Sequence, residues 1–208
     1  MDFSWHDERK TVRRRDADAM LTFMVEGPSR PRGVPALSRF EYDNLVDIGW
    51  IADQRIELLR GTLVDVSPQR WPHAAAVEFL NEQLVLQIAG RYAVRPQLPF
   101  AADHWSEPEP DLAVAHKEPM RQDHPGELLL VIEVADASQP IDRGIKHTIY
   151  AEAGVPEYWI VDLARMTVDV HTQPKNGRNS SVRTFRDGDV LRPTLVPGVA
   201  IYVAEIPR

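Results

Sequence analysis

Three acidic residues and one lysine have the types and order that could support phosphodiester chemistry. The acidic residues lie in or beside apolar segments that read as strands: Glu57 in "RIELLRG", Asp111 in "EPEPDLAVA" and Glu133 in "LLLVIEVAD". A carboxylate among apolar residues is costly to bury unless a cation or a hydrogen-bond donor pairs with it. Lys146, in "DRGIKHTIY", follows on a predicted helix and is close enough in sequence to reach the same place. This order of residues is typical of metal-dependent phosphodiesterases.

Hydrolysis of a phosphodiester requires a deprotonated water, neutralised charge on the phosphoryl oxygens and a stabilised leaving oxygen. Mg²⁺ held by carboxylates supplies much of this, and Mn²⁺ is a possible substitute. Asp111 and Glu133 are predicted to lie on adjacent strands, so they could converge on one ion together with the backbone carbonyl of Val134. Glu57 could bind a second ion or a water on the first. Lys146 could orient the attacking water or stabilise developing charge.

Simpler structural roles also fit two of these residues. Glu57 could form an ion pair with Arg55 or Arg60, which lie beside it in a predicted hairpin. Lys146 could form an exposed ion pair with Asp142, one helical turn earlier. The spacing of the carboxylates is therefore consistent with a metal site but does not by itself identify one.

The histidines add one candidate. His73 begins a predicted helix and lies on the same stripe as Val77, so it faces the core side, where a capping or core role would also suit it. Zinc ligation by other histidines is disfavoured because their spacing is irregular, unlike that of known zinc sites. These histidines are His104, His116 and His124.

The apolar pattern predicts an α/β fold. Residues 111–115 and 127–135 are near-continuous apolar runs, typical of strands at the centre of a sheet. A hairpin is predicted over 55–66, and Ser38 and Glu41 form a capping-box pattern at the start of a helix. Further helices are predicted over 73–89 and around 141–149, and further strands over 92–100 (an edge strand), 154–162, 167–172, 181–185 and 199–204. Interleaved strands and helices, with hairpins at both ends, predict a mixed central sheet with helices against its faces.

Length and composition fit one folded domain over residues 37–208 after a flexible leader over residues 1–36, which is rich in charge, proline and glycine. The chain has no cysteine, which excludes disulfides and thiolate metal sites. No apolar run approaches the roughly 20 residues of a membrane-spanning helix. The start of the chain has no apolar signal core, so the cytoplasm is the expected compartment and no membrane contact is expected.

The net charge of -7 argues against tight binding of nucleic acid by this chain alone, because such proteins usually present a basic face. Two features reduce the objection. The carboxylates of a metal site add negative charge that the ion cancels. The cations are mostly arginine, which binds phosphate in a bidentate fork, and only four are lysine (Lys10, Lys117, Lys146 and Lys175).

Over about residues 37–172 the chain resembles the Uma2 family of endonucleases, within the PD-(D/E)XK restriction-endonuclease-like superfamily. The blocks that support this are "RIELLRGTLVDVSP", "EPDLAVA", "LLLVIEVADAS" and "DRGIKHTIYAEAGVPEYWIVD". The last block is the most specific, because a set of its residues falls in family order: Lys146, Tyr150, Gly154, Val155, Pro156, Glu157, Tyr158 and Trp159. Pro110-Asp111 is the "PD", and Glu133 is the acidic residue that follows it.

The resemblance implies a restriction-endonuclease-like fold and a DNA endonuclease with Mg²⁺ bound by Glu57, Asp111 and Glu133. It implies that Lys146 is the catalytic lysine and that His73 is an auxiliary polar group near the scissile phosphate. The chain departs from the superfamily pattern at Ala135, where a lysine is expected two residues after Glu133. In the Uma2 family this lysine has moved to the following helix, the position of Lys146.

Two other functional hypotheses remain open at the level of sequence. One is a non-catalytic regulator that binds nucleic acid or protein and retains the nuclease fold, which the acidic net charge favours. The other is a metal-dependent hydrolase that acts on RNA or nucleotides. A homodimer is a possible assembly, by analogy with enzymes in which one active site cuts one strand.

Overall fold

The structure is a computed structural model that describes residues 35–51, 55–66, 69–117, 123–135 and 140–208, with backbone only at 140–143. The predicted leader lies outside the described residues apart from 35 and 36. The side chain of Asp142, the alternative partner of Lys146, also lies outside them. No helix within the described ranges is long and apolar enough to cross a membrane.

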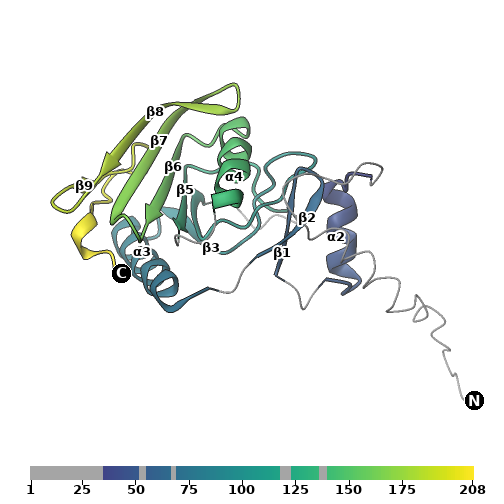
Figure 1. Ribbon diagram of the computed structural model, residues 1–208, viewed down its shortest axis with the longest axis horizontal. Helices are drawn as coiled ribbons and strands as arrows, with labels where there is room; N and C mark the ends of the chain where they lie inside the picture. The colour runs from purple at the N-terminus through teal and green to yellow at the C-terminus, as the bar shows by residue number, and fades with distance from the viewer. Residues whose placement is uncertain (1–34, 52–54, 67–68, 118–122, 136–139) are drawn as a thin grey trace, which may run out of the picture.

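The centre of the molecule is a six-stranded mixed sheet, which confirms the predicted α/β class (Figure 1). Its order is β3-β4-β5-β6-β7-β8, and β5 and β6 are the parallel pair within it. The helix α4 (Pro140–Glu152) connects these two parallel strands. The strands are β3 (Tyr92–Pro96), β4 (Leu112–His116), β5 (Leu130–Ala135), β6 (Glu157–Asp162), β7 (Thr167–Lys175) and β8 (Arg178–Phe185).

Helices cover both faces of this sheet (Figure 1). One face packs against α3 (Trp71–Ile88), through the buried stripe Ala76, Leu80, Leu84 and Ile88. The other face packs against α4 through Tyr150. Alternation along β5 decides which side chains reach which helix, because Val131 belongs to the α4 cluster and Ile132 to the α3 cluster. Glu133, two residues after Val131, therefore points to the α4 side.

The predicted first helix and hairpin form a separate unit beside the sheet, at the right of Figure 1. It consists of α2 (Arg39–Asp47), β1 (Ile56–Leu59) and β2 (Thr62–Asp65), with a small core of its own around Tyr42 and Leu58. The capping box of Ser38 and Glu41 is present at the start of α2. The backbone N–H of Glu107 donates to the carbonyl of Leu58 at 2.7 Å and ties the hairpin to the segment before β4.

The prediction for the C-terminal segment was partly wrong. Strand β10 (Ile201–Tyr202) is shorter than the predicted strand 199–204 and does not extend the central sheet. It pairs with β9 (Val190–Leu191), and the short 3-10 helix η2 (Val203–Glu205) follows. The physical reason is packing: the alternating apolar residues of this segment, Val199, Ile201 and Val203, insert into the core beside α3. The side chain of Gln87 on α3 holds the segment there by accepting from the N–H of Ala200 and donating to its carbonyl.

Candidate active site

Glu133 lies within β5, on the face covered by α4, and two donors from that helix share one of its oxygens. Tyr150 donates its hydroxyl to Glu133 Oε1 at 2.7 Å, and Lys146 Nζ lies 3.3 Å from the same oxygen. Residues 146 and 150 are four apart, so they project from one face of the helix. The amphipathic pattern of α4 thus places an ammonium and a hydroxyl on the carboxylate of β5.

Lys146 also joins Glu133 to the hairpin. Its ammonium lies 2.9 Å from each oxygen of Glu57 on β1, which is 3% exposed. The alternative pairing of Glu57 with Arg55 or Arg60 is not what the structure shows, and Arg60 instead pairs with Glu152. A residue 89 positions away from Lys146 in sequence therefore enters the same site.

Asp111 precedes β4 and reaches across to the neighbouring strand β5. Its Oδ2 accepts the backbone N–H of Val134 at 2.8 Å and lies 3.0 Å from Nε2 of His73. His73 is in the first turn of α3 and faces inward, as its stripe predicted. The structure thus brings Glu57, Asp111, Glu133, Lys146 and His73 together from four elements and the segment before β4.

Asp111 and Glu133 each present one oxygen to solvent. The bonds described above fall on Asp111 Oδ2 and Glu133 Oε1. Within the described part of the chain the other oxygens, Oδ1 and Oε2, have no hydrogen-bond partner, yet they are absent from the set of fully buried atoms without one. The two side chains are 12% and 15% exposed, so the open oxygens are not sealed from solvent.

The electrostatics of the site reflect an excess of buried negative charge. Burial, only partly offset by Lys146, raises the pKa of Glu57 from 4.5 to about 7. Burial and the nearby charge of Asp111 likewise raise the pKa of Glu133, against the opposing effect of Lys146. Burial alone would lower the pKa of Lys146, but Glu133 and Glu57 outweigh it and raise the pKa above its usual value. The lysine is therefore charged, and it cannot neutralise three carboxylates alone.

This donor set fits a hard divalent cation. Among the described residues no group of three or more histidine and acidic side chains is arranged to share an ion. Mg²⁺ does not need such a group, because it is commonly held by one or two carboxylates and keeps several waters. The open oxygens of Asp111 and Glu133 offer two carboxylate ligands of this kind.

Two polar residues of the site were not assigned to it from the sequence. Tyr150 is buried, and its hydroxyl binds Glu133. Burial raises the pKa of Glu109, and its charge acts on Lys146 and Glu57. Tyr158 and Trp159, which follow in the same block of sequence, belong to the core, since they are 1% and 0% exposed.

Comparison with known proteins agrees with this architecture. The crystal structure of a putative nuclease belonging to DUF820 from Anabaena variabilis is similar, with a TM-score of 0.60 and 14% sequence identity. The alignment covers 73% of this chain and 88% of that one, and at this identity it shows a shared fold. No protein of curated function matches the chain. The family model for Uma2, described as "putative restriction endonuclease", matches residues 47–204, so the chain belongs to the Uma2 family.

Proposed function

We propose that this protein is a Mg²⁺-dependent DNA endonuclease that hydrolyses phosphodiester bonds. The single observation that supports this most strongly is the pair of open oxygens on Asp111 and Glu133, beside a buried lysine. Membership of the Uma2 family and the nuclease fold point in the same direction. Mn²⁺ would be an acceptable substitute, because it too prefers oxygen ligands.

In this proposal Asp111, Glu133 and the backbone carbonyl of Val134 would hold the cation. Glu57 would contribute indirectly, since both of its oxygens lie 2.9 Å from Lys146. The ion would supply charge neutralisation at the phosphate and a lower pKa for the attacking water. His73 holds Asp111 Oδ2 inward, which leaves Oδ1 facing the substrate side.

Lys146 acts by charge in this proposal, not as a proton acceptor. Its raised pKa keeps it protonated at working pH, so it has no lone pair with which to deprotonate water. A protonated ammonium beside the site can orient the attacking water and stabilise charge on the phosphoryl group.

The test is cleavage of supercoiled plasmid and of single-stranded DNA with Mg²⁺ or Mn²⁺. The variants Asp111→Asn and Glu133→Gln keep the shape of each side chain and remove its charge. Loss of the cation would cost several kcal/mol of transition-state stabilisation, so we expect rates to fall by about a thousandfold or more. Glu152→Gln is the matched control, because Glu152 lies on α4 but pairs with Arg60 at the surface. Cleavage by Asp111→Asn at the parent rate would refute the site.

The alternative, a non-catalytic binding protein with a nuclease fold, is favoured by the net charge of -7. The melting temperature separates the two, because a ligand that binds only the folded state raises it. A functional site predicts a rise with Mg²⁺ in the parent and none in Glu133→Gln. The hypothesis of a binding protein is supported if Mg²⁺ raises the melting temperature of neither the parent nor the variant and if neither protein cuts DNA.

A further inference from the structure

An exposed tryptophan stands beside the candidate active site. Trp71 is the first residue of α3 and is 77% exposed, the largest exposure among the big apolar side chains of the described residues. It precedes His73 by two positions, about 3 Å along the helix axis. Residues two apart point to different sides of a helix. Trp71 therefore faces outward at the point where His73 faces inward to Asp111.

The start of α3 lacks two stabilising features that the start of α2 has, a capping side chain and an acidic residue in the first turn. The N-cap of α3 is Arg70, which makes no side-chain capping bond, and its first turn contains no acidic residue. A capping side chain would stabilise the helix, and a cation is the less favourable charge at this end. The start of α2 has a complete capping box from Ser38 and Glu41. Departures from local rules of this kind concentrate at functional sites.

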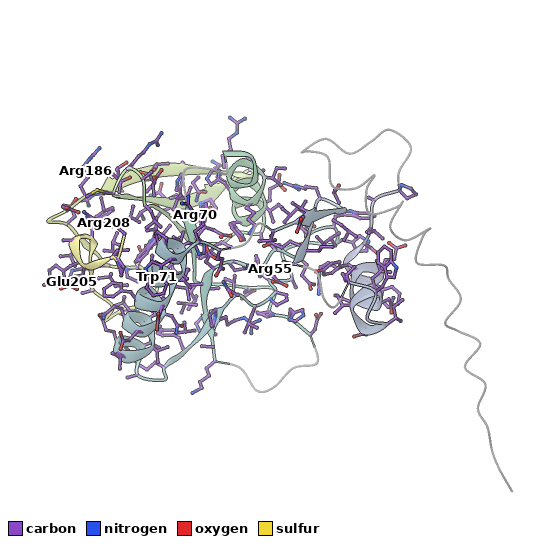
Figure 2. The ribbon with its side chains drawn as sticks, turned by 60° about the horizontal axis from the view of Figure 1, so that its bottom comes forward. Arg55, Arg70, Trp71, Arg186, Glu205 and Arg208 are labelled. Carbon is purple, nitrogen blue, oxygen red and sulfur yellow. The ribbon has the colours of Figure 1, made fainter. Side chains whose placement is uncertain are left out.

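A second arginine lies on the hairpin side of the candidate site. Arg55 is exposed, directly precedes β1, and its charge acts on both His73 and Glu109. In Figure 2, Arg55 lies toward the hairpin, and Arg70 and Trp71 lie at the start of α3. Lys146 is not available to bind substrate outside the site, because it is held between Glu57 and Glu133. The cations that contact the phosphates on either side of the scissile one must therefore come from outside the site.

We propose that Trp71 stacks on an unpaired base next to the scissile phosphate, while Arg55 and Arg70 contact the flanking phosphates. This rests on the proposed function and specifies its substrate as single-stranded or locally unpaired DNA. An indole face stacks on any base, and stacking requires a base that is not already paired within a duplex. The arginines provide the matching charge.

Direct binding to a labelled oligonucleotide tests this. The probes are fluorescein-labelled (dT)20 and a duplex of the same length, measured by anisotropy with EDTA so that no cleavage occurs. Stacking of one base predicts that Trp71→Ala weakens binding of (dT)20 by about tenfold or more, and that Trp71→Phe retains most of the affinity. The affinity for the duplex should change by less than about threefold. In cleavage assays the loss falls on KM rather than on kcat.

Phe40→Ala is the matched control. Phe40 is 73% exposed and occupies the second position of α2, so it is also an exposed aromatic residue at the start of a helix. It should leave both Kd values unchanged. An equal loss of affinity in Phe40→Ala, or an unchanged affinity for (dT)20 in Trp71→Ala, would overturn the inference.

Three other outcomes would distinguish binding of an unpaired base from other roles of Trp71. Equal losses with (dT)20 and duplex would reject an unpaired base as the ligand. A change of oligomeric state in Trp71→Ala without a change in (dT)20 binding would identify the surface as a contact between copies of the chain. If the parent binds (dT)20 through Trp71 but does not cut it with either metal, the inference stands and the proposed endonuclease activity fails.

Discussion

At the scale of single residues, the two oxygens of each carboxylate in the pair Asp111 and Glu133 have different surroundings. One oxygen of Asp111 and one of Glu133 is held by donors of the protein, and the other faces solvent. A carboxylate fixed in this way cannot rotate to offer its second oxygen without breaking a hydrogen bond. Under the proposed function, the donors that hold the inner oxygens would therefore control how well the outer ones are positioned for a cation.

Tyr150 provides a direct test of whether a donor to the inner oxygen of Glu133 affects cation binding. Burial and the nearby charges of Glu133 and Glu57 raise the pKa of Tyr150 well above its usual value, so the hydroxyl is always a donor. Tyr150→Phe removes that donor and little volume. Loss of such an outer partner typically costs ten- to a hundredfold in metal affinity or activity, so we expect the Mg²⁺ concentration for half-maximal cleavage to rise by about tenfold or more.

The control for this variant is Tyr42→Phe. Tyr42 is also buried, and its hydroxyl donates to the backbone carbonyl of Ile56 at 2.8 Å. It should lose about 1 kcal/mol of stability, as expected for one buried hydrogen bond, with no change in the Mg²⁺ requirement. A similar Mg²⁺ dependence in both variants would mean that Tyr150 serves only in packing.

The stability of the metal-free protein should depend on the charge of Glu57. Its pKa is 4.5 in the unfolded chain and about 7 in the folded protein. A carboxyl whose pKa is raised on folding stabilises the protein fully below the lower value, and this contribution is lost as the pH rises through the higher one. In EDTA, the free energy of unfolding should therefore fall between pH 5 and 8, by up to about 3 kcal/mol from this group.

Denaturant titrations of the parent and Glu57→Gln at several pH values measure this effect. The variant cannot ionise at this position, so the difference in stability between the two proteins should shift in favour of Glu57→Gln as the pH rises. A difference that stays constant from pH 5 to 8 would mean that Glu57 has an ordinary pKa in the folded state.

At the scale of elements, the hairpin turn sets the position of Glu57. Gly61 has a φ of +74°, and a Cβ added there would lie 2.6 Å from the Cβ of Ala36. Gly61→Ala therefore combines an unfavourable backbone conformation with a steric clash. We expect a loss of stability of about 2–3 kcal/mol, since the clash adds strain to the cost of the positive φ. Activity should fall as well, because the turn would move the strand that holds Glu57.

Gly49→Ala separates the two causes. Gly49 has the same φ of +74°, but nothing lies within 4 Å of an added Cβ. This variant should lose only about 1 kcal/mol, the cost of the backbone conformation itself. Equal losses of stability in the two variants, measured by thermal unfolding, would show that the contact with Ala36 is relieved at no cost.

The elements that the sequence predicted well are those defined by local chemistry. The capping box at Ser38 marked the start of α2, and the apolar run around Glu133 marked a central strand. The partners of the site residues could not be predicted in this way. Glu57 and Lys146 meet across the molecule, and Val199 and Ile201 pack beside α3 because of tertiary contacts that the alternating pattern of residues 199–204 does not contain.

The exposure of Trp71 could not be predicted either. The predicted helix began at His73, whereas α3 begins at Trp71. A tryptophan is usually largely buried, so the sequence alone favours a place in the core for it. Only the position of the helix start relative to the sheet shows that this side chain points outward.

At the scale of the whole molecule, the candidate site lies where two separately packed units meet. The hairpin unit has its own small core and contributes Glu57, and the unit built on the two faces of the central sheet contributes the other site residues. Arg39 on α2 reinforces the junction through its ion pair with the buried Glu107, at 2.7 Å. Contacts at this junction are therefore expected to influence the geometry of the candidate site as well as stability.

The charge of the whole molecule bears on the proposed binding of DNA. With a net charge of -7, electrostatic attraction over the whole surface is unfavourable, so affinity must come from a few local phosphate contacts and from stacking.

For single strands, log K falls with log salt by about 0.7 for each phosphate contacted, so contacts from Arg55 and Arg70 predict a slope of only about -1 to -2 for (dT)20. Arg55→Ala should reduce the magnitude of this slope by about 0.7, whereas Trp71→Ala should lower the affinity at every salt concentration and leave the slope unchanged. Anisotropy titrations from low to moderate salt measure both quantities. A slope much steeper than -2 would mean that a broader basic surface, which the proposed contacts do not include, binds the strand.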